Sequence, residues 1–390
     1  MAHDQSIYDV IVIGDEVESL LTAISAARMG ARVAVVRQNE GDLGGLSTRG
    51  GLSYMDITPE FIPPLFGEFL RRAGVVRVAL NRDRAVAALD AMIAEARVAV
   101  FSGVSCTAVV ENLRIAVLAL SDGRTLAAPV FIDATPDADI ARQVGVPFIQ
   151  GLGGILGGAN NYLGVTPVFR IRGVSCQEMQ SFEAHLRGLA ETPARLQQAL
   201  PHKTPHELAE LIVRPTYAPE GLDYLDILNP VIGVWYHVWR PGHAETYARA
   251  KMSIDGGNVS RLTDGSLGFN GLIYRVADDP EAFEKLLAWS HGAPMPVELG
   301  QELKHFEHFL QGEGGFHEAE VLPPEELYVR QTVTLLSREN MTAEKALLGG
   351  VSPENAVGTF SYWLDMRGAE LWRHYPGEHL PKPVFNVGLD

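Results

Sequence analysis

The first forty residues contain two apolar runs that enclose a segment with helical spacing. Residues 8–13 end in four consecutive branched apolar residues, and residues 33–36 form a second apolar run. Between them, apolar residues recur every three or four positions over residues 17–29, and Gly30 follows. Short apolar runs on either side of a helical period predict a βαβ unit. Both runs are too short to cross a membrane.

The turn between the first strand and the helix carries the chemistry of such a unit. In the dinucleotide-binding pattern G-x-G-x-x-G, the first glycine makes the turn and the second lets a diphosphate approach the helix N-terminus. Gly14 takes the first place here, but Glu16 and Ser19 take the second and third, with Val17 between them. Arg37 stands where an acidic residue normally binds the ribose. Two interpretations stay open: a dinucleotide site, or a βαβ unit that kept its packing and lost its ligand.

Further elements follow in the first 150 residues. A glycine-rich loop over residues 38–52 could line a flat or anionic ligand or form a flexible surface loop. Apolar periodicity predicts helices over residues 60–73 and 82–96. Short alternating segments predict a meander of strands over residues 98–101, 106–111, 113–120 and 125–129, with a hairpin turn at 121–124. Residues 130–133 predict a strand that turns into a helix, which Asp133 or Asp137 could cap.

The character of the sequence changes near residue 150. Residues 150–161 are rich in glycine and uncharged, which predicts a linker into a second domain. Beyond it, we expect strands over residues 166–172, 231–240 and 267–276, and helices over residues 177–192, 204–214, 282–289 and 297–311. The expected organisation is a nucleotide-binding-type domain over residues 1–150, a second domain over residues 151–330 and a returning segment over residues 331–390.

The composition narrows the classes of partner. The formal net charge of −16 over 390 residues argues against a nucleic-acid or anionic-membrane partner. The N-terminus has neither a basic region nor a signal-type apolar core, so we expect a cytoplasmic protein. Cys106 and Cys176 are the only cysteines and lie far apart, which excludes a local redox dithiol.

Aromatic and histidine clusters offer further candidate chemistry. If residues 235–240 form a strand, Trp235, His237 and Trp239 face one way, either as the wall of a planar substrate pocket or as packed sheet aromatics. Two histidine pairs have helical spacing, but prolines interrupt one pair and neither has an evident third ligand, so we expect no metal site. These pairs are His202 with His206 and His305 with His308.

Three segments together resemble a known family. Y-D-V-I-V-I-G, A-R-M-G-A-R-V-A-V-V and L-G-G-L-S-T-R-G-G-L follow one another in the order and spacing seen in the FAD-dependent oxidoreductases of the glutathione-reductase-like fold. The resemblance implies an α/β protein with a Rossmann-like FAD/NAD(P)-binding domain, an inserted β-meander and a second α+β substrate-type domain. It also implies FAD as cofactor and a small molecule as substrate.

The resemblance extends to individual positions. It implies that Gly44, Gly45 and Thr48 pass close to the flavin. The turn residues Gly14, Glu16 and Val17, together with Arg37, would belong to the cofactor site at the diphosphate and ribose positions. The backbone near Cys106 would border the adenine. Asp137 would keep the family carboxylate of the D-A-T-G-D segment, which here has Pro136 in place of the glycine. Arg330 matches a recurring arginine that would lie near the flavin or a substrate anion, with a surface ion pair as the alternative.

The departures from the family pattern set up three hypotheses. Three departures fall at cofactor positions. They are Glu16, Pro136 and a C-terminal part that we expect to be shorter than in the family. The first hypothesis is an FAD-dependent oxidoreductase that passes hydride from a small substrate to flavin. The second is a non-enzymatic scaffold or partner subunit, completed by another protein or a second copy. The third is a site for another nucleotide, with Arg37 on a phosphate. We expect weak FAD binding or none.

Overall fold

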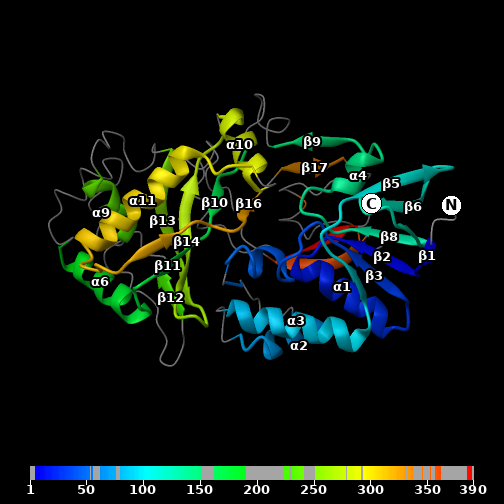
Figure 1. Ribbon diagram of the computed structural model, residues 1–390, viewed down its shortest axis with the longest axis horizontal. Coiled ribbons are helices and arrows are strands. Elements are labelled where there is room, and N and C mark those ends of the chain that lie inside the picture. Colours follow the sequence, from blue (N-terminus) through cyan, green and yellow to red (C-terminus); the bar gives the residue numbers. More distant parts are fainter. Residues whose placement is uncertain are drawn as a thin grey trace.

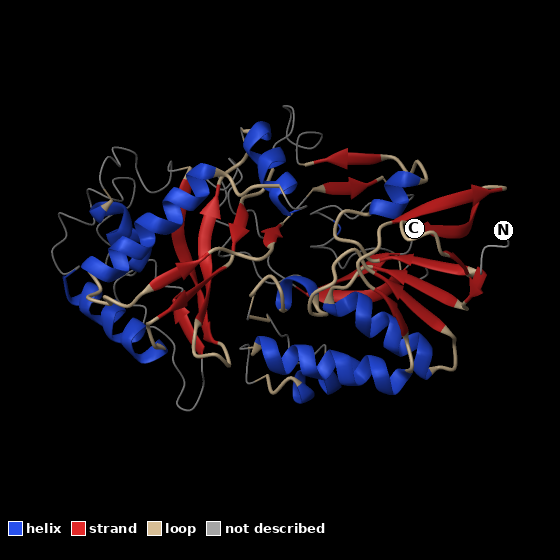
Figure 2. Cartoon of the chain, viewed as in Figure 1, coloured by secondary structure: helices blue, strands red, loops and turns tan. Residues whose placement is uncertain are grey.

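The computed structural model describes most of the chain (Figure 1). The residues that it describes are 5–52, 54–55, 62–75, 80–151, 162–189, 224–227, 231–240, 251–277, 279–290, 293–330, 332–336, 345, 352, 356–361 and 384–388. Within them, strands gather into two main groups, with loops running between the groups (Figure 2). No helix among these residues combines the length and the apolar character that a membrane crossing requires.

A parallel sheet forms the centre of the N-terminal part. Its strands are β2 (Val10–Ile13), β3 (Val33–Val36), β4 (Ala99–Phe101) and β8 (Val130–Asp133), in the order β4-β3-β2-β8. Three helices lie together on one face (Figure 1): α1 (Val17–Arg28), α2 (Pro64–Arg72) and α3 (Arg82–Ala96). This is the predicted Rossmann-like arrangement, in which right-handed crossovers place successive helices on the same face.

Alternate residues of the central strands enter different cores. Val12 and Val35 pack against the helices, whereas Ile11 and Ala34 pack against the meander on the opposite face. All four are fully buried, because the sheet is covered on both faces. This explains why the two strands read as continuous apolar runs in the sequence.

The meander forms a separate, smaller sheet. Strands β5 (Cys106–Glu111), β6 (Arg114–Leu120) and β7 (Thr125–Ala127) pair antiparallel in chain order, and β1 (Gln5–Ile7) adds to β7. The hairpin turn at residues 121–124 is confirmed, with Gly123 at φ 90°. One grouping was wrong: residues 99–101 join the parallel sheet beside β3, because β4 closes a crossover rather than a hairpin. The short helix α4 (Asp139–Gln143) follows β8.

The second part of the chain forms an antiparallel sheet packed against helices, called the second sheet from here on. Its order is β12-β13-β14-β10-β16, and β11 also pairs with β14 and β15. The strands are β10 (Val165–Pro167), β11 (Phe169–Arg172), β12 (Tyr224–Ile227), β13 (Met252–Arg261), β14 (Leu267–Tyr274), β15 (Glu320–Leu322) and β16 (Leu327–Val329). The helices are α6 (Cys176–Leu189), α9 (Val231–Trp239), α10 (Pro280–Ser290) and α11 (Val297–Gly312). Aromatic rings dominate its single core, as where Phe169 stacks on Phe269 with centroids 5.0 Å apart.

The prediction of a strand over residues 231–240 was wrong, because these residues form helix α9. The run is apolar almost throughout, so both the strand period and the helix period fit it. The neighbours Trp235 and Tyr236 are both buried, which a strand with one covered face does not allow. The Trp235 indole donates a hydrogen bond to the Leu186 carbonyl of α6 at 3.1 Å, so this cluster packs the core instead of lining one strand face.

Helix α9 makes contact with the sheet through Gly233. A β-carbon added there would overlap the Ile254 carbonyl oxygen of β13. Glycine to alanine in a helix normally stabilises by up to about 1 kcal/mol. We expect the opposite sign for Gly233→Ala, a loss of about 2 to 3 kcal/mol, because backbone cannot move aside cheaply. Denaturant unfolding measures it, with Gly188→Ala in α6 as the control, since nothing lies within 4 Å of a β-carbon at that position. Equal effects of the two substitutions would contradict the close packing.

The remaining predictions concern connections. The strand expected over residues 166–172 is two strands, β10 and β11, which both pair with β14 but have different second neighbours, β16 and β15. The chain returns from the second sheet through β17 (Val333–Leu335), which pairs with β9 (Phe148–Gln150), and ends in the pair β18 (Ala356–Ser361) and β19 (Val384–Gly388). The predicted helix over residues 204–214 and nearly all of the predicted linker lie outside the described residues.

Candidate functional site

The turn between β2 and α1 meets the glycine-rich loop of residues 38–52. Gly14 makes this turn at φ 128°, and a β-carbon on it would overlap the Ala134 carbonyl at the end of β8. The Gly14 amide donates to the Val36 carbonyl at 3.0 Å. Gly14 therefore has the role that the first glycine of the dinucleotide pattern predicts, which is a tight turn at the carboxyl edge of the sheet.

Glu16 extends its side chain from the turn to the loop. Its two carboxylate oxygens accept from the Leu46 amide at 3.0 and 3.2 Å. A β-carbon on Gly45 would overlap this carboxylate, and Gly45 has a φ of 51°, which other residues rarely adopt. The Gly44 amide, in turn, donates to the Asp15 carbonyl at 3.0 Å. The turn and the loop are thus bonded to each other directly, through the residue that replaces the second glycine.

Glu16 lies at the N-terminus of α1 without capping it. No side-chain hydrogen bond caps the helix, because the carboxylate turns away toward Leu46. Burial, followed by the negative charges of Glu326, Glu18 and Asp15, raises the pKa of Glu16 to about 8, although the hydrogen bond from the Leu46 amide lowers it. Glu16 is therefore predominantly protonated at neutral pH.

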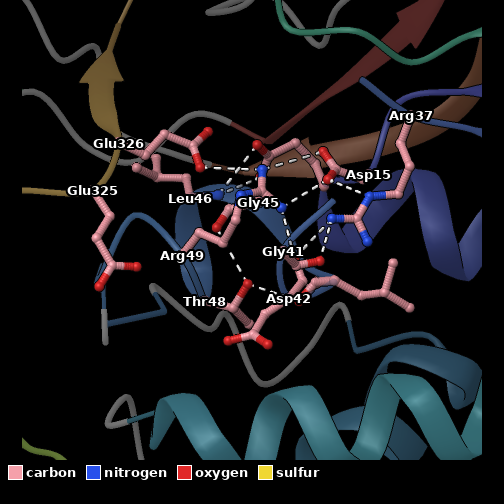
Figure 3. Close-up of polar contacts among 12 residues, drawn as sticks. Asp15, Arg37, Gly41, Asp42, Gly45, Leu46, Thr48, Arg49, Glu325 and Glu326 are labelled. Atoms are coloured by element: carbon pink, nitrogen blue, oxygen red, sulfur yellow. Dashed lines mark hydrogen bonds and ion pairs between the residues drawn. The ribbon is translucent and has the colours of Figure 1, made fainter. Parts of the chain in front are cut away.

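Asp15, next to Glu16, holds two arginines. Arg37 at the end of β3 places its Nε 3.0 Å from Asp15 Oδ2, and Arg49 of the loop places an Nη 2.7 Å from the same oxygen (Figure 3). Arg37 also donates to the Gly41 carbonyl and, at 3.2 Å, to the Asp42 carbonyl. The Arg37 side chain is only 3% exposed. The arginine that replaces the expected ribose-binding acid is thus turned back into the protein and satisfied there.

Arg49 connects this group to the second part of the chain. It donates to the Asp42 carbonyl at 2.6 Å and pairs with Glu326 at 3.2 Å. Glu326 precedes β16, so it belongs to the second sheet. Two carboxylates, Asp15 and Glu326, thereby face two guanidinium groups. Their charges balance, and within the described part of the chain no cation pairs with Glu16, which agrees with its raised pKa.

The loop itself is held by a buried threonine. The Thr48 hydroxyl donates to the Leu43 carbonyl at 2.7 Å, and Thr48 is fully buried. Gly44 and Gly45 adopt φ values of 103° and 51°, which open the short 3-10 helix η1 (Gly45–Ser47). The structure therefore brings Gly14, Glu16, Arg37, Gly44, Gly45 and Thr48 together, while Val17 is buried as the first residue of α1.

The other three candidate residues bond elsewhere. Arg330 donates to the Gly164 carbonyl at 2.7 Å and to the Thr166 hydroxyl at 2.9 Å, which ties the end of β16 to β10. Asp137 accepts from the Thr332 hydroxyl. Cys106 begins β5, and burial together with Asp133 and Asp139 raises the pKa of its thiol to about 11. Such a thiol is not a nucleophile at neutral pH.

The two aspartates near α4 have different roles. Asp133 accepts from the Thr135 amide and hydroxyl, and from the Ala141 amide in α4 at 2.8 Å. Asp133 therefore supports the start of the helix, as one of the two alternatives predicted. Asp137 instead accepts a hydrogen bond from the returning segment and does not support the start of α4.

Sequence reasoning missed three residues of the site, which are Asp15, Arg49 and Glu326. It did not predict the ion pairs that they form. One signal was available, because an arginine in the place of the ribose-binding acid and an acid in the preceding turn are a matched exchange of charge. Glu326 gave no local signal, since it comes from a different sheet. Among the described residues, no group of three His, Cys, Asp or Glu side chains could hold a metal ion, while His202 and His206 lie outside them.

Comparison with known proteins identifies the family. The family described as FAD dependent oxidoreductase matches residues 9–389, and a search of curated proteins found no match. Similar solved structures include a geranylgeranyl bacteriochlorophyll reductase-like protein from Thermoplasma acidophilum, with 14% identity, TM-score 0.42, and coverage of 85% of this chain and 67% of that one. A myxobacterial FAD-dependent chondrochloren halogenase has 11% identity, TM-score 0.46, and coverage of 86% and 66%. L-Proline dehydrogenase from P. horikoshii has 9% identity, TM-score 0.42, and coverage of 90% and 86%.

The chain thus spans about two thirds of the first two of these structures. The family match covers nearly all of the sequence, and the parallel sheet, the crossover helices and the inserted meander give the expected FAD-binding fold. This chain belongs to the FAD-dependent oxidoreductase family.

Proposed function

We propose that this chain is a member of the family that does not take FAD at the β2–α1 turn and acts as a non-catalytic scaffold or partner subunit. The observation that carries the proposal is the Glu16 carboxylate on the Leu46 amide, beside Gly45, where a β-carbon would overlap that carboxylate. A carboxylate stands there in place of the glycine through which the family pattern admits a diphosphate.

The residues around the turn do not fit a diphosphate. A bound diphosphate needs free backbone donors and unpaired positive charge. The Leu46 donor already binds Glu16, and both arginines are already neutralised by Asp15 and Glu326. A diphosphate would have to displace the Glu16 side chain from the Leu46 amide, and its negative charges would further disfavour the ionised form of Glu16.

A second candidate function is FAD-dependent oxidation of a small molecule. Two observations favour it. The N-terminus of α1 has no side-chain cap, so its dipole is available to an anion, and the raised pKa of Glu16 makes that side chain neutral at pH 7. In that case the flavin would supply the redox chemistry, and the chain would position it and the substrate.

Spectroscopy and calorimetry of the purified protein distinguish the two functions. We expect a colourless protein whose titration with FAD at pH 7 gives no binding tighter than about 1 mM, which corresponds to about 4 kcal/mol. A flavin absorbance spectrum with stoichiometric FAD released on denaturation would overturn the proposal. The particle mass by light scattering, compared with 42.4 kDa for one chain, separates self-association from the need for another partner.

A further inference from the structure

Two neighbouring glutamates of the second sheet contact arginines of the first domain. Glu325 and Glu326 lie between β15 and β16. Glu326 pairs with Arg49 of the glycine-rich loop at 3.2 Å, and Glu325 pairs with Arg82, the first residue of α3, at 3.1 Å. Figure 3 shows both glutamates beside this loop. One short segment therefore carries two ion pairs from one domain to the other.

Both pairs are supported on the first domain, and the pair of Glu325 is also supported on the second. On the first domain, Asp15 holds Arg49 at 2.7 Å, and Asp42 holds Arg82 at 3.1 Å. On the second, Arg170 of β11 holds Glu325 at 2.9 Å. The ion pairs form two continuous rows, which we call the interdomain cluster; its members are Asp15, Arg37, Arg49 and Glu326 in one row and Asp42, Arg82, Glu325 and Arg170 in the other.

The two rows differ in burial. The Arg49 side chain is 11% exposed and that of Glu326 is 25% exposed, whereas that of Glu325 is 41% exposed. Burial raises the pKa of Glu326, but Arg49 opposes this shift, so the pair is partly desolvated. A neighbouring hydrogen bond, from the Thr263 hydroxyl to the Asn81 side chain at 3.1 Å, also crosses between the domains. Loss of Glu326 therefore leaves a partly buried arginine without one of its partners, which is costlier than loss of a surface pair.

We infer that the interdomain cluster holds the two domains together without any ligand between them. Networks with several charges keep their geometry better than single surface pairs, because each side chain is fixed by more than one partner. The contact is also salt-sensitive, since the outer row is open to counterions. This inference does not depend on the proposed function, because the contacts involve only residues of this chain.

Hydrogen exchange of the backbone, measured without FAD, tests the inference. The reporting amides are those of Thr48, Gly50 and Leu52 in the loop, which donate to carbonyls of the same loop, and those of β16. We expect Glu325→Gln with Glu326→Gln to accelerate exchange in both segments on the order of tenfold, and about 1 M salt to accelerate it in the unchanged protein.

Glu320→Gln is the matched control. Glu320 lies in the same part of the chain, in β15, and faces Arg172 of its own domain at 4.0 Å with both side chains more than half exposed. We expect it to leave the exchange of both segments unchanged. The salt titration needs no variant, so it decides the question even if the double substitution prevents folding. Unchanged exchange of the loop in 1 M salt, or equal acceleration by Glu320→Gln, would overturn the inference.

Discussion

Replacing Glu16 by glycine is expected to raise the affinity of this chain for FAD by about 100-fold or more. The substitution restores the second glycine of the dinucleotide pattern and removes the carboxylate that occupies the Leu46 amide. If that carboxylate costs a bound diphosphate about 3 kcal/mol, its removal corresponds to about two powers of ten in affinity. Calorimetric titration with FAD at pH 7 measures the change.

Glu18→Gly is the matched control for this experiment. Glu18 lies in the same first turn of α1 and carries the same charge, but it is exposed to solvent. We expect its substitution to change the FAD affinity by less than about threefold, since an exposed charge is screened. The account of the closed turn fails if Glu16→Gly and Glu18→Gly act equally, or if unchanged protein binds FAD as tightly as Glu16→Gly.

Glu16 is also expected to make the protein less stable as the pH rises. Its native pKa is about 8, against the ordinary 4.5 of a glutamate carboxyl, so the native state binds more protons than the unfolded state between these values. The free energy of unfolding therefore falls as the pH rises from about 4.5 to about 8 and levels off above. The shift corresponds to a change of at most about 5 kcal/mol.

Glu16→Gln should remove this pH dependence. The amide oxygen can still accept from Leu46, but the side chain no longer ionises. We expect the variant to match the unchanged protein near pH 5 and to be more stable by about 2 to 4 kcal/mol at pH 9. Denaturant unfolding at several pH values measures the difference between the two proteins, in which the contribution of Glu326 largely cancels.

A constant difference between the two proteins across this pH range would contradict a buried, cation-free Glu16. Glu18→Gln is again the control, and it should change the unfolding free energy by less than about 0.5 kcal/mol at each pH. Because this measurement uses no FAD, it tests the charge environment of the turn independently of cofactor binding.

The fold is preserved although the turn is altered, because the residues that stabilise the core are not the residues that would bind a diphosphate. The strands next to the turn are buried on both faces by apolar side chains, such as Ile11 and Val12, that pack into two apolar cores. Gly14 is required by its conformation and by the approach of Ala134, whether or not a dinucleotide binds. Residues that only a diphosphate requires, such as a glycine at position 16, are free to change without loss of the core.

Local patterns predicted the elements in which one period dominated. The helix over residues 82–96 and the strand over residues 106–111 have the predicted bounds. The segment over residues 231–240 was misread, because an apolar run without polar positions has no period to distinguish a helix from a strand. Only its position against β13, with Gly233 at the contact, determines the helix.

The sequence by itself determined the βαβ unit, the meander, the family and the acidic character of the β2–α1 turn. These features depend on residues close together in the chain, whose burial follows from local spacing. Only the tertiary structure decided which acid of the turn has a cation. Asp15 faces Arg37 and Arg49, whereas Glu16 faces Leu46 and the negative charge of Glu326. Charge pairing depends on distances between elements that are far apart in sequence, and a difference of a few ångströms in a buried site decides between attraction and repulsion.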